Sequence, residues 1–108
     1  MKKYLGSIIK NYDVHKIGHN FINQVKYTLS LQHQNKISRL VIIAPITSKI
    51  KQLFPFEVKV NIQKKEGKIM LDQIRSVDKA RLSGKLSSIG IETMFDIEKA
   101  LKIVFALT

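Results

Sequence analysis

Two short segments of this 108-residue chain end apolar, strand-like runs in polar side chains that could act on a phosphate group. In the first, the aliphatic run Val41–Ala44 reaches Pro45, and Thr47 and Ser48 follow directly after Ile46. Because proline is confined to sheet edges, strand ends and bulges, we expect the two hydroxyl groups to leave the sheet at its rim. Hydroxyl groups in that position face a ligand or solvent.

The second segment brings an acid, an amide and a cation into the length of one predicted strand, Ile69–Ile74, and the residue after it. These groups are Asp72, Gln73 and Arg75. Reactions at phosphorus require groups that move protons and preorganised donors that stabilise negative charge, and arginine can hold a phosphate through two parallel hydrogen bonds. The two segments together therefore predict a site for phosphate chemistry.

The charge of the chain favours a polyanionic partner. Nineteen Lys and Arg against 8 Asp and Glu give a formal net charge of +11, which attracts nucleic acid. The alternative is a lysine-rich surface that only keeps a small protein in solution. The chain has no cysteine, so disulfides and thiolate metal sites are excluded. Its length predicts a single domain covering residues 1–108.

No segment of the sequence predicts secretion or a membrane span. The apolar start of the chain is interrupted by Lys10, Asn11 and Asp13, which is too early for a signal peptide. The longest apolar run, Leu40–Ile46, is far shorter than the ~20 residues that a membrane helix needs. We therefore expect a soluble, cytoplasmic protein without membrane contact.

Hydrophobic periodicity predicts a mainly β fold that closes with one helix. The expected strands are 40–46, 56–62, 69–74 and 85–89, with polar turns at 64–68 and 76–79. Apolar residues at helical spacing predict a helix over Ile91–Ala106 that packs on the sheet, with Met94 and Phe95 in the core. Residues 1–36 alternate only weakly, and one strand over Val25–Leu31 is expected there.

The segment Phe54–Pro55–Phe56 follows a lysine-rich loop and could stack on nucleobases. The alternative is that an aromatic ring there belongs to the core. We expect Phe56 to begin a strand that faces the core, and only Phe54 to be exposed.

Several of these blocks resemble the MazF/PemK toxins. They are Ala44–Ser48, Leu71–Arg75, Asp78–Leu82 and the closing helix, in the family's order and spacing across residues 37–107. The resemblance implies an SH3-like small β-barrel of the MazF/PemK/CcdB toxin type, acting as a homodimer. It also implies the toxin of a type II toxin-antitoxin system, an endoribonuclease that cleaves single-stranded mRNA without a metal or cofactor. A cognate antitoxin, with an acidic disordered tail over the RNA groove, is the implied inhibitor.

The resemblance also implies roles for individual residues. Thr47 would hydrogen-bond the scissile phosphate, Ser48 would support it, and Asp72 would act as acid or base. The RNA contacts would come from His19, Lys26, Lys49, Lys51, Gln73, Arg75 and Arg81. His15 and His19 do not predict a metal site, because Lys16 stands where the zinc-protease pattern requires glutamate.

Each of these roles has a structural alternative. Thr and Ser at a strand end often satisfy only the backbone, and an Asp there often binds a turn amide. Arg75 and Arg81 could form salt bridges with Asp72 or Asp78 instead of holding phosphate. Gln73 could fill a sheet position, and a histidine on a surface loop such as His19 could have no role.

The first third of the chain, residues 1–36, departs from the family pattern, whereas residues 37–108 follow it. Val25–Lys26 occupies the position of the family's Arg-Pro pair, and no arginine occurs before Arg39, so the principal catalytic arginine cannot be carried over. A locally shifted reading frame and rapid divergence both account for residues 20–34. Lys26 would replace the arginine poorly, because losing one preorganised donor costs on the order of 10²- to 10³-fold in rate.

Three functional interpretations follow. The first is an endoribonuclease toxin, fully active, weakened or inactive. The second is a non-catalytic remnant that dimerises and binds antitoxin or RNA. The third is an inhibitor that binds DNA gyrase through its C-terminal helix, but Val104–Thr108 shows no aromatic or polar signature for that role.

Overall fold

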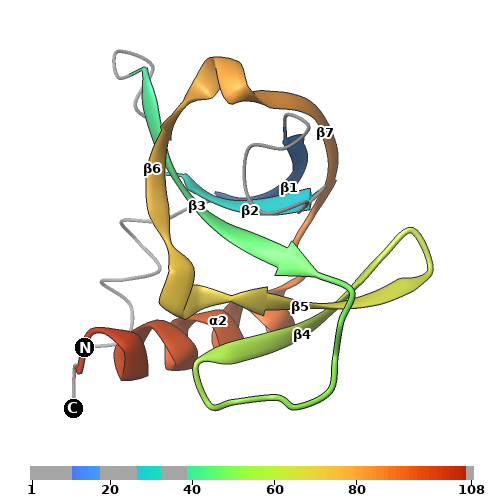
Figure 1. Cartoon of the computed structure of the whole chain (residues 1–108), viewed down its shortest axis with the longest axis vertical. Helices are drawn as coiled ribbons and strands as arrows, with labels where there is room; N and C mark the ends of the chain where they lie inside the picture. Colours follow the sequence, from blue (N-terminus) through green and yellow to red (C-terminus); the bar gives the residue numbers. More distant parts are fainter. Residues whose placement is uncertain (1–10, 18–26, 33–38, 107–108) are drawn as a thin grey trace.

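The computed structural model describes residues 11–17, 27–32 and 39–106, which form a strongly curled sheet with a helix packed against it (Figure 1). Seven strands pair in the order β4-β5-β3-β2-β1-β7, and β6 also pairs with β3. The elements are β1 Asn11–Ile17, β2 Tyr27–Gln32, β3 Leu40–Thr47, β4 Glu57–Ile62, β5 Lys65–Met70, η1 Leu71–Gln73, β6 Arg75–Asp78, η2 Lys79–Arg81, β7 Leu82–Ser88 and α2 Ile91–Val104. The predicted mainly β fold with a C-terminal helix is confirmed.

The central strand is β3, which pairs with β2 along one edge and with both β5 and β6 along the other. Pairing with β5 ends at Ile46 opposite Ile69, and pairing with β6 begins at Ile43 opposite Arg75. Pro45, which has no N–H group to donate, lies in the gap between these two partners. The strand therefore continues through the proline, one residue beyond the predicted end, to Thr47.

Two apolar cores hold the fold together. The larger lies between one face of the sheet and α2, where Ile97, Ala100 and Leu101 of the helix pack against strands on both sides of β3. The smaller lies within the curl of the sheet, where β1, β3 and β6 meet. It comprises Ile17, Val41, Ile43 and Val77, with Leu82 packed against it. The curl that brings Ile17 to Val77 is what gives the sheet the form of a half-barrel.

The region from residue 63 to residue 79 differs from the sequence prediction. The turn of the β4–β5 hairpin lies at Gln63 and Lys64, whose φ angles of 50° and 68° suit a tight two-residue turn. The predicted turn at 64–68 is wrong, because Lys65 already begins β5 and the glycine within the segment serves strand packing. The predicted turn at 76–79 is also wrong, because Arg75–Asp78 forms β6.

The predicted strand 69–74 stops early, at Met70, and Leu71–Gln73 forms a short 3₁₀ helix, η1. Leu71 is fully buried there, so the chain leaves the strand in order to bury this side chain in the larger core. Asp72 and Gln73 therefore lie on η1, and the charged and amide groups do not share one strand with Arg75.

The C-terminal helix follows the predicted stripe only in part. Ile97 and Leu101 are buried, but Ile91 is 68% exposed and Phe95 is 59% exposed, so the expected core position of Phe95 is wrong. The helix ends at Val104, before the predicted Ala106. Strand β1 was not expected from the weak alternation of the first third. The predicted strand Val25–Leu31 is matched by β2 over its described residues, and Val25 and Lys26 lie outside the described residues. In the part of the chain that the structure describes, no helix is long and apolar enough to cross a membrane.

Candidate functional site

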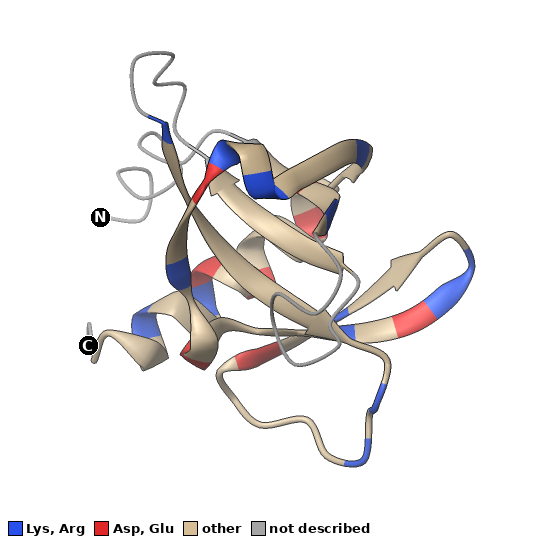
Figure 2. Ribbon diagram, turned by 45° about the horizontal axis from the view of Figure 1, so that its top comes forward, with Lys and Arg blue, Asp and Glu red and all other residues tan. Residues whose placement is uncertain are grey.

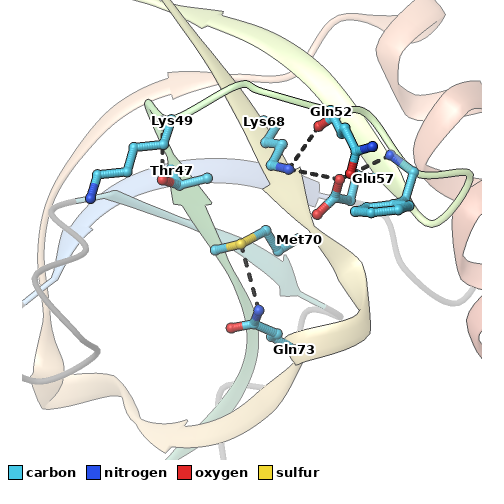
Figure 3. A network of polar contacts seen from close by, with 8 residues as sticks. Thr47, Lys49, Gln52, Glu57, Lys68, Met70 and Gln73 are labelled. Atoms are coloured by element: carbon cyan, nitrogen blue, oxygen red, sulfur yellow. Dashed lines mark hydrogen bonds and ion pairs between the residues drawn. The ribbon is translucent and has the colours of Figure 1, made fainter.

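The site begins at the exposed end of β3, where the strand turns into a loop. Thr47 is the last strand residue and is half-buried, and Ser48 and Lys49 after it are exposed. The Lys49 N–H donates to Thr47 Oγ1 over 3.2 Å (Figure 3). Since a hydroxyl can accept and donate at once, the Thr47 O–H proton is left to donate to a bound oxyanion. Thr47 lies at the rim of the sheet, as the sequence predicts, but it is still paired with Lys68 in β3, and only Ser48 has left the strand.

Gly67 allows β5 to pack closely against this end of β3. A Cβ atom built at Gly67 would lie 3.1 Å from the Thr47 carbonyl oxygen and 3.2 Å from Ile46 Cγ2. Both contacts are tighter than ordinary packing, so a side chain at residue 67 would displace the backbone of Thr47. The sequence predicts a turn at this glycine and gives no sign that its missing side chain allows β5 to approach Thr47.

A buried ion pair fixes the loop that follows Thr47. Lys68, the cross-strand partner of Thr47, places its Nζ 2.9 Å from Glu57 Oε1 and 2.9 Å from the Gln52 carbonyl oxygen (Figure 3). The side chains of Lys68 and Glu57 are only 10% and 6% exposed. Glu57 Oε1 also accepts the N–H of Phe54 over 3.0 Å. Lys68 is therefore a structural cation that ties loop 48–56 to the sheet.

The sequence reading missed the Lys68–Glu57 pair. The signal that could have found it is the register of the β4–β5 hairpin, in which Glu57 lies opposite Met70 and Lys59 opposite Lys68. This register makes Glu57 and Lys68 diagonal neighbours on one face of the sheet. The sequence predicts the turn at 64–68 instead, and that register does not make Glu57 and Lys68 neighbours.

The amide and the acid of the second segment lie on η1, beside the gap in the pairing of β3. Asp72 and Gln73 are both exposed, and Gln73 Nε2 donates to Met70 Sδ over 3.6 Å. Neither side chain fills a sheet position, because η1 is outside the ladder. Both are therefore accessible to a ligand at the rim of the sheet.

Arg75 is exposed on β6 and faces the same side of the sheet as Thr47. Its cross-strand partner is Ile43, and residues 43, 45 and 47 share a face because side chains alternate along a strand. Ile43 and Thr47 are about 13 Å apart along the strand. Of the residues that the structure describes, none forms an ion pair with Arg75, so the salt-bridge alternative finds no support there.

The other predicted RNA contacts are not gathered at this rim. Arg81 lies on η2, which begins where the Lys79 N–H donates to the Arg39 carbonyl oxygen over 2.7 Å, next to the start of β3 and opposite the Thr47 end. Asp78 serves η2 by accepting the Ala80 N–H over 2.9 Å. Lys49 and Lys51 are exposed on loop 48–56. His19 and Lys26 lie outside the described residues.

Lysine and arginine residues are spread over the loops and hairpins of the molecule. The ribbon in Figure 2 marks their positions on the loop between β3 and β4, on the β4–β5 hairpin and on β6 and η2. An extended anionic strand is attracted to such a surface at several points. Among the residues that the structure describes, no group of three or more His, Asp or Glu could hold a metal ion.

A second polar cluster joins β1 to β7. Asp13 Oδ1 accepts from Ser88 Oγ over 3.0 Å and lies 3.6 Å from Lys85 Nζ. On the same face of β1, His15 Nε2 is buried without a hydrogen-bond partner in the described part of the chain. Burial lowers the pKa of His15, the nearby Lys85 charge lowers it further, and Asp13 opposes both effects. At neutral pH this imidazole is uncharged, which suits a structural role better than phosphate binding.

Comparison with known proteins identifies the class that this fold and rim site define. Residues 14–105 match the family described as PemK-like, MazF-like toxin of type II toxin-antitoxin system. The chain is also 35% identical over 78 residues to endoribonuclease EndoA of Bacillus subtilis, a match that covers 68% of this chain and 67% of the relative. The chain therefore belongs to the PemK/MazF toxin family of type II toxin-antitoxin systems.

Solved structures support the same fold. A mycobacterial endoribonuclease, solved in complex with its cognate antitoxin, superimposes with a TM-score of 0.76 at 20% identity, covering 89% of this chain and 93% of that one. MazF of Deinococcus radiodurans superimposes with a TM-score of 0.67 at 23% identity, covering 85% and 93%. At these identities the likeness concerns the fold, which is the half-barrel with its C-terminal helix.

Proposed function

We propose that this toxin, a single domain, is an endoribonuclease that cleaves single-stranded mRNA at the rim of the sheet without a metal ion. One observation carries the proposal: the Thr47 hydroxyl, oriented by the Lys49 N–H, stands at the exposed end of β3 on the face that also presents Arg75. The match to endoribonuclease EndoA supports the same activity.

In the proposed reaction the 2′-oxygen of the RNA attacks the adjacent phosphorus. The O2′–P bond forms and the P–O5′ bond breaks, leaving a 2′,3′-cyclic phosphate and a free 5′-hydroxyl. One proton leaves the 2′-hydroxyl and one reaches the 5′-oxygen, and the Asp72 carboxyl takes part as acid or base. Thr47 and Ser48 donate to the charged phosphorane oxygens.

The arginine absent from position 25 leaves a cation to be supplied from elsewhere. Arg75 is the arginine that the structure presents on the face of Thr47, and a guanidinium holds phosphate oxygens in fixed geometry. We assign it the stabilisation of negative charge in the transition state. Lys49 and Lys51 guide the phosphate backbone, and Gln73 contacts a base.

The proposed partners follow from the family and from the charge of the chain. A cognate antitoxin with an acidic, disordered tail would bind the basic face and exclude RNA, and the relative solved with its cognate antitoxin supports this class of partner. We further propose that the toxin acts as a homodimer in the cytoplasm.

A second candidate function is supported by the sequence of the first third. Val25–Lys26 replaces the family's Arg-Pro pair, which favours a non-catalytic remnant that dimerises and binds antitoxin or RNA. Cleavage separates the two candidates.

The test is incubation of the purified protein with long single-stranded RNA in EDTA. We expect discrete cuts that vanish in Thr47→Ala and persist in Thr93→Ala, a matched control on α2. No cuts by the native chain, together with cuts by Val25→Arg, would locate the defect in the missing arginine. No cuts by either chain would refute the proposed activity and favour the remnant.

A further inference from the structure

We propose that Phe54 forms a stacking platform for one nucleobase of single-stranded RNA, on the loop between β3 and β4. The inference deepens the proposed function, since it names a base-binding subsite beside the phosphate site. It concerns a residue to which the reaction above gives no role.

Phe54 is presented to solvent as a rigid aromatic surface. Its ring stacks on that of Phe56, with the centroids 5.4 Å apart and the planes inclined by 7°, and 44% of the residue remains exposed. A parallel, offset pair of rings provides the inner layers of a stack. The Phe56 ring flanks the Phe54 ring, and Lys68 Nζ lies over the Phe54 ring, 5.8 Å from its centre, so a nucleobase would stack on the part of the ring that these two neighbours leave open.

The backbone and the side chain of Phe54 are both held in place. The Glu57 N–H donates to the Phe54 carbonyl oxygen over 2.9 Å, closing a turn with Pro55 at its second position. The Phe54 N–H donates to Glu57 Oε1 over 3.0 Å, and Lys68 Nζ lies 5.8 Å from the centre of the Phe54 ring. Because these contacts fix the ring before RNA binds, binding a base costs little conformational entropy.

The platform is connected to the phosphate site through Lys68. Lys68 is the cross-strand partner of Thr47, and its ammonium group donates to the Gln52 carbonyl oxygen of the loop (Figure 3). The same ammonium group lies 5.8 Å from the centre of the Phe54 ring. Thr47 therefore stands at one end of a continuous set of contacts and Phe54 at the other. A nucleotide whose phosphate binds at Thr47 has neighbours within reach of the ring.

The positive charge near Phe54 favours RNA over an apolar protein segment as the partner that binds there. Lys49 and Lys51 are exposed on the same loop, so an RNA strand that lies over Phe54 meets cations for its phosphates and an aromatic ring for a base. This combination of a basic track and aromatic rings is how proteins bind single strands without reading their sequence. An apolar protein segment would make no use of the two lysines.

The test measures RNA binding without cleavage. Binding of fluorescent 12-nucleotide adenine, uracil and cytosine homopolymers is compared with binding of an abasic strand of equal length, in EDTA and in a Thr47→Ala background. We expect Phe54→Ala to weaken binding of the base-bearing strands by about 5- to 150-fold and to leave the abasic strand unchanged. Phe54→Trp should bind at least as tightly as the native residue.

Phe95→Ala, which removes another exposed phenyl ring on α2, is the matched control and should not change binding. Equal binding by native and Phe54→Ala proteins would overturn the inference, as would equal losses for base-bearing and abasic strands. A change of molar mass in light scattering with RNA binding intact would also overturn it, and would assign Phe54 to a protein interface. Loss of binding in Phe54→Ala without RNA cleavage by the native chain would support the platform and refute the proposed activity.

Discussion

The buried pair of Lys68 and Glu57 predicts a large and asymmetric response to mutation. Lys68→Met leaves the Glu57 carboxylate, 6% exposed and 2.9 Å from the lost ammonium, without its cation. Removing one partner of a buried ion pair typically costs about 3–5 kcal/mol, because the remaining charge cannot be hydrated. That is a large part of the roughly 5–15 kcal/mol that stabilises a domain, so the melting temperature should fall by at least about 12 °C.

The stability of the double variant Lys68→Met/Glu57→Gln tests whether the unpaired Glu57 charge causes the loss. Glu57→Gln keeps an oxygen that can accept the Phe54 N–H but removes the charge, so adding it to Lys68→Met should restore stability. Unfolding by urea, followed by circular dichroism, measures both variants and the native chain. The exposed pair of Lys59 and Glu66, 3.5 Å apart, is the control, and Lys59→Met should cost less than about 1 kcal/mol. A loss below about 1 kcal/mol for Lys68→Met, or no restoration by Glu57→Gln, would show that the pair does not stabilise the fold in this way.

Four further predictions concern Gly67, His15 and Tyr12. Gly67→Ala should push the Thr47 carbonyl away and lower the RNA cleavage rate by about 10-fold or more. Gly90→Ala, where the added methyl group meets open space, should keep full activity. Equal cleavage rates for the two variants would contradict the positioning role of Gly67. The pKa of His15 in the folded chain lies below its ordinary value, so as the pH falls the unfolded chain binds a proton at this residue before the folded chain does. The free energy of unfolding should therefore fall as the pH drops below about 6.5. His15→Gln should show a shallower fall between about pH 7 and 5.5. An identical slope in the two proteins would remove His15 as the cause. Burial, with a smaller contribution from the Glu98 charge, raises the pKa of Tyr12 to about 12, so above pH 10 the folded chain keeps a proton that the unfolded chain loses. The free energy of unfolding should therefore decline as the pH rises above about 10, by up to about 2–3 kcal/mol. Tyr12→Phe should abolish that decline. Because the Tyr12 hydroxyl has no partner among the described residues, Tyr12→Phe should also be as stable as the native chain at pH 7, or up to about 1–3 kcal/mol more stable; a clear loss in thermal unfolding would show that the hydroxyl is satisfied.

The sequence predicted the elements whose side chains repeat with a clear period. Strand β3 and helix α2 were found because one is a long β-branched run and the other buries Ile97 and Leu101 on one face. The exposed position of Ser48 after the strand was expected from the proline, although β3 continues through Pro45 to Thr47. These features depend on local pattern alone.

Other features depend on contacts between distant segments. The break at η1 is caused by burial of Leu71 in the core under α2, and no local signal marks it. Gly67 looked like a turn residue because its close approach to Thr47 exists only after β5 pairs with β3. Phe95 has the spacing of a core residue, but the helix turns that side chain to solvent.

The structure brings the residues that the sequence named together only in part. Thr47, Ser48 and Lys49 are consecutive, and Arg75 shares the sheet face of Thr47, whereas Arg81 lies at the other end of β3. Residue type and order along the chain suggested the candidate residues. The register of the sheet decides which of those residues meet.

The proposed cleavage is tested most directly by identifying the ends of the RNA fragments made in EDTA by the native protein and by Thr47→Ala. The proposed reaction predicts 2′,3′-cyclic phosphate and 5′-hydroxyl ends from the native protein and a loss of cleavage of at least about 10²-fold in Thr47→Ala. Fragments with 5′-phosphate ends, or undiminished cleavage by Thr47→Ala, would contradict it.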